Sequence, residues 1–260
     1  MILVANGCSH TCGAEMEYPG QRACVEKAWP KYLANNLNYD YVNLADSGGS
    51  AHRVVRTTIR YIIDSFSKKK KLDDHYFVIM WPGIYRDEIA PFKNVTKEEE
   101  PQFLDDGWLQ VIVGNDSYYR KAFSKRMFYY FKAWVVGLEP IKSNMDYLHH
   151  ILLLQNFFTL HKIKYLFWTA SHSVIDFSHK DLKGYLGLIN KKYYPFLDDI
   201  QQSYNVLMKN NNQLISEPSM ASGFGSHYDE AAQIWFANYL HNYIKSNSLI
   251  TGLKDKLLLY

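Results

Sequence analysis

The sequence has few cysteines, almost no net charge and no long hydrophobic run, and each shortage argues against a class of protein. Three cysteines are an odd number, which argues against a complete disulfide framework and favours a reducing compartment. With 29 Lys and Arg against 26 Asp and Glu, the formal net charge is only +3, unlike that of a dedicated nucleic-acid binder. No apolar run reaches the roughly 18 residues that span a bilayer, and the first residues lack a secretory leader. We therefore expect a cytoplasmic protein with no nucleic-acid or membrane partner.

Aromatic side chains are abundant. They make up 16 % of the chain, with 21 tyrosines and 6 tryptophans, within a hydrophobic total of 47 %. Charged residues account for 21 %, a balance that is typical of a globular protein and excludes wholesale disorder. Because Tyr and Trp bury area while keeping a polar tip, this composition predicts an interactive surface as well as a core.

Short apolar runs alternate with amphipathic segments along the chain. Strands are expected at 2–5, 39–44, 76–81 and 165–168, and helices at 28–37, 54–66, 118–136, 144–161 and 229–245. This alternation predicts an α/β fold in which a central parallel sheet is covered by helices on both faces. No internal repeat or linker is visible, so we expect a single domain over residues 1–260.

One segment breaks this rhythm. Residues 93–115 are polar and acidic, with a strand expected at 108–113, and we interpret them as a hairpin or lid within an insertion spanning about 93–145. The aromatic residues at 128–131 and Trp134 could form a helix or subunit interface, or a surface on which a sugar stacks. The basic run 68–71 is expected to be a solvated helix end, with a phosphate-binding role as the alternative.

Candidate chemistry lies in three turns. Ser9 follows the first expected strand and could present its hydroxyl above the sheet edge, or simply cap a helix. The segment 43–50 contains Gly48 and Gly49, which could turn a backbone amide toward a ligand or merely turn the chain. His227 precedes the last expected helix and could be a general base or an inert loop histidine.

The order of these turns resembles the SGNH (GDSL-like) hydrolase superfamily, a flavodoxin-like three-layer α/β/α fold of esterases, lipases and deacetylases. The resemblance covers residues 2–243 apart from the insertion, and it implies that Ser9 is the nucleophile and His227 the base. It also implies that the backbone amides of Ser9 and Gly48 hold the oxyanion, with Gly49 as the alternative after a one-residue slip. The stretches 4–11 and 47–53 look most like SGNH-like proteins of tailed bacteriophages, which would place the protein in a virion or host cytoplasm.

Two departures from the family pattern stand out. Residues 80–83 read Met-Trp-Pro-Gly where the family has Gly-x-Asn-Asp, so the oxyanion asparagine is missing. Arg86 could replace that donor, or it could form a surface ion pair with Glu88. Phe224 stands where the family has an aspartate three residues before His227, so the usual third triad member is absent at its usual site, and a backbone carbonyl could orient the imidazole instead.

Other residues raise the question of a metal. Cys8, His10 and Cys12 offer soft ligands at close spacing, and Cys24 could add a fourth. Because the first three lie across the expected active turn, their side chains are expected to diverge, and we expect neither a metal nor a cofactor. The pair 149–150, His-His, lies in an apolar helix, where packing is favoured over ligation.

Together these features predict a serine ester hydrolase, of the esterase or carbohydrate O-deacetylase type, with a Ser9–His227 dyad or incomplete triad. Its substrate would be a small-molecule or carbohydrate ester. The alternative is a catalytically weak or inactive SGNH fold that serves as a structural or binding module, for instance in a phage particle. In that case the aromatic surface would hold a second copy of the chain or a virion partner.

Overall fold

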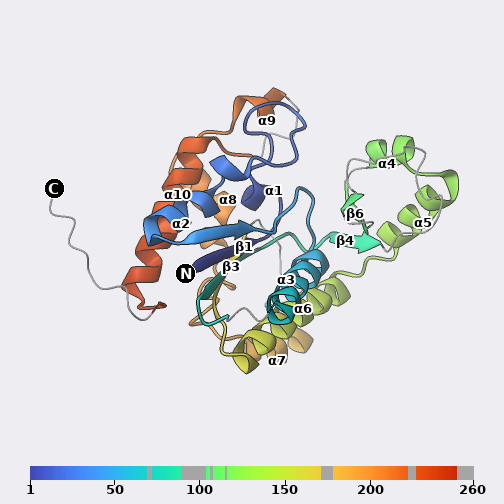
Figure 1. Cartoon of the computed structure of the whole chain (residues 1–260). Coiled ribbons are helices and arrows are strands. Elements are labelled where there is room, and N and C mark those ends of the chain that lie inside the picture. The colour runs from blue at the N-terminus through green and yellow to red at the C-terminus, as the bar shows by residue number, and fades with distance from the viewer. Residues whose placement is uncertain are drawn as a thin grey trace.

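The computed structural model describes residues 1–68, 72–89, 104–105, 108–114, 116–170, 178–221 and 227–250. Within these residues, the central sheet has four strands in the order β2-β1-β3-β7, and all neighbouring pairs are parallel (Figure 1). The strands are β1 (Ile2–Asn6), β2 (Asp40–Asn43), β3 (His75–Trp81) and β7 (Lys164–Thr169). The predicted parallel α/β sheet is therefore confirmed.

Side chains of the sheet alternate between two separate cores. On β3, Tyr76, Val78 and Met80 join one core, while Phe77, Ile79 and Trp81 join the other. This is the period of two that an extended strand imposes. All residues of β3 are buried, as expected for a strand covered on both faces.

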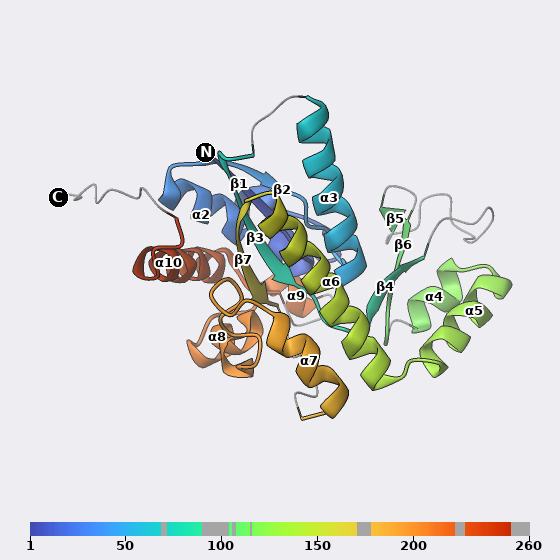
Figure 2. The same cartoon turned by 90° about the horizontal axis from the view of Figure 1, so that it is seen from below.

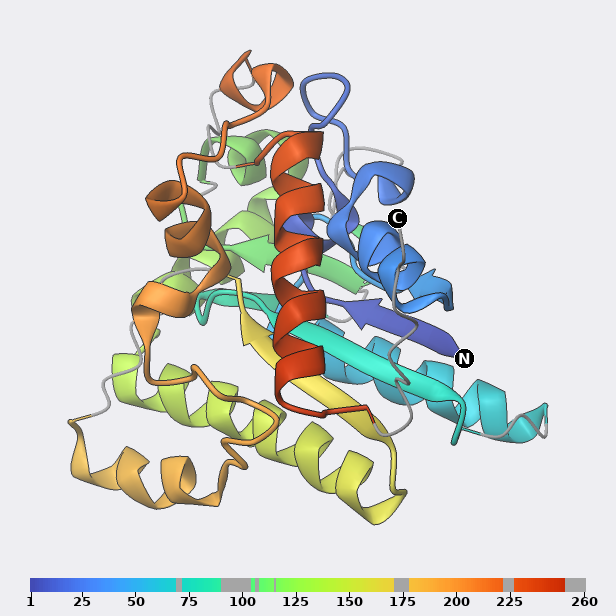
Figure 3. The ribbon, with the colours of Figure 1, turned by 90° about the vertical axis from the view of Figure 1, so that its left-hand side faces the viewer.

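Helices cover both faces of the sheet and give the molecule three layers. Figure 3 shows α10 running across one face, with α3 and α6 beyond the sheet. The first face is covered by α2 (Trp29–Leu37), α8 (Tyr204–Asn210) and α10 (Glu230–Ser246). The second face is covered by α3 (Ala51–Ser67), α6 (Pro140–Leu160) and α7 (Lys180–Leu188). Short helices in the connections are α1 (Ser9–Cys12), η1 (Val25–Lys27), η2 (Ile200–Gln202) and α9 (Glu217–Ala221).

No helix in the described ranges is both long enough and apolar enough to cross a bilayer. The expected basic run 68–71 lies mostly outside these ranges. Its first residue, Lys68, is an exposed C-cap of α3, which agrees with a solvated helix end.

A lateral lobe, formed by the described residues between Arg86 and Val136, stands beside the three layers (Figure 2). Its antiparallel sheet has the order β4-β6-β5, and two helices pack on that sheet. These elements are β4 (Arg86–Ile89), β5 (Leu104–Asp105), β6 (Trp108–Ile112), α4 (Asp116–Ala122) and α5 (Lys125–Val136). The strand expected at 108–113 is thus present, and the lobe's sheet already begins at Arg86, before residue 93.

The single helix expected over 118–136 is wrong, because the chain breaks it into α4 and α5. Ser124 caps α5 by accepting a hydrogen bond from the Met127 amide, and such side-chain caps favour a new helix start. Phe131 is buried in the lobe's own core, whereas Tyr129 and Tyr130 are 62 % and 53 % exposed. The aromatic stretch therefore contributes both to the lobe's core and to its surface.

The lobe is joined to the main body by polar contacts. Arg56 of α3 donates two hydrogen bonds of 2.9 Å to the Glu88 carboxylate, and its guanidinium lies over the Trp108 ring at 4.9 Å. Since the Glu88 side chain is fully buried and both of its oxygens bond Arg56, the expected Arg86–Glu88 surface pair is wrong.

Candidate active site

The turns that follow β1, β2 and β3 meet at one edge of the sheet, because parallel strands place their carboxyl ends together. A Cβ on Gly7 would lie 2.7 Å from the Met80 carbonyl oxygen, and a Cβ on Gly49 would lie 2.7 Å from the Gly7 carbonyl oxygen. Only glycine allows backbones to approach this closely. The two sequence segments that contain Ser9 and Gly48 thus lie against each other.

Ser9 is the first residue of α1 and is 5 % exposed. The helix N-cap is Cys8, so the alternative in which Ser9 caps the helix is wrong. The Ser9 amide lies in the first turn of α1, where no intrahelical acceptor exists, and no other acceptor is found for it among the described residues. This amide is free to donate to a ligand.

Gly48 and Gly49 differ in what their amides do. The Gly49 amide donates to the Asp46 carbonyl at 3.1 Å within the turn, whereas the Gly48 amide has no acceptor in the described part of the chain. Gly48 has a φ of 83°, a left-handed conformation that favours glycine. Asp46 holds the turn in place, because its carboxylate accepts hydrogen bonds from Arg22 and, at 3.1 Å, from Gln110 of the lobe. Between the two glycines, Gly48 is the one that can supply a donor.

His227 is held by a buried carboxylate that the sequence reasoning did not identify. Its Nδ1 lies 2.8 Å from Glu15 Oε2, and the two side chains are only 11 % and 3 % exposed. The other oxygen, Glu15 Oε1, accepts from the Gly20 amide at 3.1 Å. Phe224, the position at which the SGNH resemblance predicts an aspartate, lies outside the described residues. Within the described residues, Glu15 is the carboxylate that pairs with His227.

The backbone at Glu15 adopts an uncommon conformation that tertiary hydrogen bonds hold in place. Glu15 has a φ of 54°, a left-handed conformation that is uncommon for a residue other than glycine and carries strain of about 1–3 kcal/mol. Its amide donates to the Gln21 carbonyl at 2.9 Å, and its carbonyl accepts from Ser216 Oγ at 2.7 Å. The one available signal is an acidic residue soon after the Ser9 turn, and no spacing rule singles it out.

Burial lowers the pKa of both histidines near Ser9, which favours their neutral form. Burial lowers the pKa of His227 below its ordinary value of 6.5, against the opposing effect of the Glu15 carboxylate, and Arg86 lowers it further. Burial, followed by the charges of His227 and Arg86, holds the pKa of His10 well below its ordinary value. A neutral His227 that donates Nδ1–H to Glu15 carries its lone pair on Nε2, the form that a general base requires.

Ser9 and His227 lie at the same end of the sheet, but no hydrogen bond joins them within the described structure. The ring of His10, the residue after Ser9, is centred 5.4 Å from the ring of His227. The contact of His10 with His227 therefore places Ser9 and His227 in the same region of the structure, without a direct hydrogen bond between them among the described residues.

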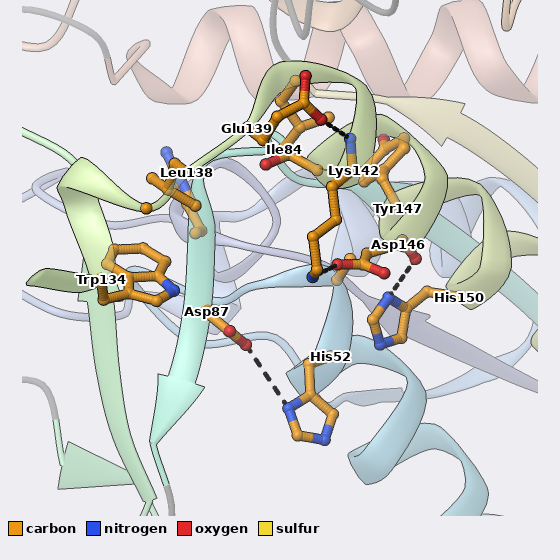
Figure 4. A pocket seen from close by; sticks show the side chains of 14 residues that line it. His52, Ile84, Asp87, Trp134, Leu138, Glu139, Lys142, Asp146, Tyr147 and His150 are labelled. Atoms are coloured by element: carbon orange, nitrogen blue, oxygen red, sulfur yellow. Dashed lines mark hydrogen bonds and ion pairs between the residues drawn. The ribbon is translucent and has the colours of Figure 1, made fainter. Parts of the chain in front are cut away.

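A cavity of about 420 Å³ opens between the main body and the lobe. Figure 4 shows Trp134 and Leu138 on one side of it, with Tyr147 and His150 of α6 on the other. Arg86 also lines this cavity. The lobe thus completes a binding space that the three layers do not form alone.

The structure offers little for a metal. No group of three His, Cys, Asp or Glu side chains gathers in the described ranges, and Cys8, Cys12 and Cys24 are free thiols. Burial raises the pKa of Cys12, which disfavours the thiolate that a metal would need. The expectation that the protein has no metal stays a prediction.

The two histidines of α6 have separate surroundings. His149 is exposed, and its ring centroid lies 4.9 Å from that of Tyr185. It therefore packs on the helix face, as predicted. His150 instead lines the cavity, with its Nδ1 2.7 Å from the Asp146 carbonyl oxygen. His150 is thus a candidate for ligand contact.

The fold and site define an α/β protein of the three-layer type, with a serine and a carboxylate-paired histidine at the carboxyl edge of a parallel sheet. The chain belongs to the Family of unknown function (DUF6071), whose profile matches residues 13–188. Neither Ser9 nor His227 lies within that match. No curated protein matches the chain.

Solved structures with a similar course of the chain include GDSL-type proteins. A G-D-S-L family protein from Desulfitobacterium hafniense is 12 % identical, with a TM-score of 0.45, over 93 % of this chain and 98 % of its own. The esterase EstA from Pseudoalteromonas is 9 % identical, with a TM-score of 0.42, over 94 % and 97 %. The acetyl xylan esterase Est2A from Butyrivibrio proteoclasticus is 12 % identical, with a TM-score of 0.46, over 96 % and 65 %. These likenesses concern the fold alone, and the likeness to phage proteins stays a prediction.

Proposed function

We propose that the protein is a serine hydrolase that cleaves ester bonds, with Ser9 as nucleophile, His227 as general base and Glu15 as the residue that orients His227. The observation that carries this proposal is the buried 2.8 Å hydrogen bond between Glu15 and His227, at the sheet edge where Ser9 begins α1. An acid that fixes the imidazole tautomer is what a serine–histidine pair needs to work efficiently.

In this mechanism the Ser9 hydroxyl oxygen attacks the ester carbonyl carbon while His227 Nε2 takes the hydroxyl proton. The amides of Ser9 and Gly48 donate to the oxyanion of the tetrahedral intermediate. His227 then passes the proton to the departing alcohol, which leaves an acyl group on Ser9. A water molecule, deprotonated by His227, attacks the acyl carbon and releases the acid together with free Ser9.

The oxyanion would be held by two amide donors, without the asparagine side chain that the SGNH pattern supplies. We therefore expect a slower reaction than in an enzyme that has all three donors. Losing one oxyanion donor typically costs about 10²–10³ in rate. The Gly49 amide does not replace the missing donor, because this amide already donates to the Asp46 carbonyl. The cation of Arg86 adds positive charge near His227.

The proposed substrate is a small-molecule or carbohydrate ester. The cavity favours a polar alcohol as its leaving group. The half-buried Trp134 ring borders a wall that carries Lys142, Asp146 and His150, so an apolar face and hydrogen-bonding groups converge there. Such a combination suits a ligand with hydroxyl groups on a compact ring better than a long acyl chain.

The second candidate is an inactive fold that serves as a binding module. It is favoured by the absence of a hydrogen bond between Ser9 and His227 in the described structure and by the exposure of Tyr129 and Tyr130 on α5. Exposed tyrosines are frequent anchors at protein interfaces.

A fluorophosphonate probe tests the proposal without knowledge of the substrate, because it labels only an activated serine. We expect labelling of the native protein and none of Ser9→Ala. Glu15→Gln should slow labelling by about 10²–10⁴, since the equivalent loss in serine proteases costs about 10⁴. Turnover of 4-nitrophenyl acetate should follow the same order.

Matched controls separate chemistry from folding. Ser67→Ala changes an exposed serine of α3, and Glu17→Gln changes a carboxylate that pairs at the surface with Lys27. Both variants should be labelled like the native protein. Equal labelling of Ser9→Ala and native protein would remove Ser9 as nucleophile, and an unlabelled native protein would favour the binding module.

A further inference from the structure

The acidic side chains of the cavity wall all have partners. Asp146 pairs with Lys142 at 2.5 Å, and Asp87 lies 3.7 Å from His52 Nδ1 (Figure 4). The third carboxylate, Glu139, caps α6 by accepting from the Lys142 amide. Hydrogen bonds and opposite charge thus compensate every carboxylate that lines the cavity.

Arg86 is the lining side chain that has no such compensation. It makes no hydrogen bond or ion pair with the described residues, and its Nη1 is buried without a partner. The two carboxylates that follow it in sequence have other partners: Asp87 lies 3.7 Å from His52 Nδ1, and both oxygens of Glu88 accept hydrogen bonds from Arg56. Partial burial of a guanidinium group without a counter-charge costs free energy, which binding of an anion would offset. This position therefore favours a negatively charged group of a ligand.

Arg86 lines the cavity, and its charge also acts on histidines of the proposed active site. Its charge contributes to lowering the pKa of both His10 and His227, after the larger effect of burial. Ala51, another lining residue, directly follows the turn that contains Gly48. Ser9, Gly48 and His227 do not line the cavity, so a ligand that contacts both Arg86 and Ser9 would extend beyond the cavity.

We propose that Arg86 binds a carboxylate of the ligand, so that the cavity selects an anionic ester over a neutral one. The planar fork of guanidinium donors matches a carboxylate in a two-bond geometry that an ammonium group cannot reproduce. His52 and Lys142 already have carboxylate partners, which leaves Arg86 as the cation available to the ligand. That the ligand is an ester rests on the proposed function, whereas the preference for an anion does not.

The test compares two ligands of nearly the same shape, O-acetylglycolate and its neutral amide, O-acetylglycolamide, which carry the carboxylate or the amide on the alcohol part of the ester. Their affinities are measured by calorimetry on the full chain carrying Ser9→Ala, so that hydrolysis cannot interfere. We expect the anion to bind roughly ten-fold or more tightly than the amide. Adding Arg86→Gln should bring the two affinities together.

The control is Lys132→Gln, which removes a lobe cation that pairs with Asp116 outside the cavity lining. It should leave the preference for the anion intact. Equal affinities in the Ser9→Ala protein, or binding of neither ligand, would overturn the proposal, and so would a preference that survives Arg86→Gln. An anion preference in a protein that no fluorophosphonate labels would uphold this inference while the hydrolase proposal fails.

Discussion

At the residue scale, the main feature is the burial of two neutral histidines beside one another. His10 is 4 % exposed, and its ring is centred 5.0 Å from the Tyr204 ring and 5.4 Å from that of His227. Both histidines have their pKa lowered chiefly by burial. The unfolded chain therefore binds protons below pH 6.5 that the folded protein does not bind.

This difference predicts a loss of stability on acidification. The stabilisation is fully present above the unfolded pKa of 6.5 and is lost as the pH falls below it, by up to about 1.4 kcal/mol per pH unit for each histidine. Melting temperatures measured between pH 7.5 and 5 should fall, and His10→Phe should reduce the slope. His149→Phe, on the exposed face of α6, should leave it unchanged. Identical slopes for native protein and His10→Phe would contradict the assignment.

At the element scale, the connection between β2 and α3 positions the proposed oxyanion donor. Ser50 caps α3 by accepting from the Arg53 amide at 3.1 Å, and Arg53 Nη1 donates back to the Leu44 carbonyl at 2.7 Å. These bonds close the turn around Gly48 and Gly49. Hydrogen bonds within the β2–α3 connection fix the shape of the turn, whereas its position against the end of β1 depends on the close approach of Gly49 to Gly7.

Gly49→Ala tests that close approach. The new Cβ would stand 2.7 Å from the Gly7 carbonyl oxygen, so the two turns must separate, and we expect a loss of about 1–3 kcal/mol in the free energy of unfolding. Gly184→Ala is the matched control, because nothing lies within 4 Å of its Cβ position within α7. That change should be neutral or stabilise by up to about 1 kcal/mol. Urea denaturation measures both, and similar values would refute the steric argument.

At the scale of the whole molecule, the lateral lobe is joined to the layers through the buried Arg56–Glu88 pair and the Gln110–Asp46 hydrogen bond. The second of these contacts reaches the turn that holds Gly48. Docking of the lobe therefore shapes both the cavity and the proposed oxyanion site.

Breaking the buried pair should destabilise the molecule strongly. Glu88→Gln removes the fully buried negative charge that accepts two hydrogen bonds from Arg56, and we expect a loss of about 3 kcal/mol in the free energy of unfolding. The exposed pair Lys191–Asp198 gives the comparison, since Asp198→Asn should cost less than about 1 kcal/mol. Urea denaturation of the two variants side by side checks this, and equal losses would show that the lobe is held by other contacts.

Local patterns were enough to predict much of this protein. The four parallel strands, the helices on both faces and the meeting of the Ser9 and Gly48 turns follow from apolar periodicity and from the geometry of parallel strands. The break between α4 and α5 was missed because the aromatic periodicity continues through Ser124, and only the cap bond to Met127 reveals it.

By itself, then, the amino-acid sequence determined the layers of the fold and the turns in which Ser9, Gly48 and His227 stand, since those depend on neighbours a few residues away. Only the tertiary structure decided which groups meet. Glu15 and His227 are 212 positions apart, and Arg56 and Glu88 are 32 apart. Such pairings depend on how segments distant in sequence pack together, and no local periodicity encodes them. The few cysteines and the near-zero net charge argued against whole classes of protein, whereas the proposed preference for an anionic ligand rests on Arg86, whose side chain has no partner among the described residues.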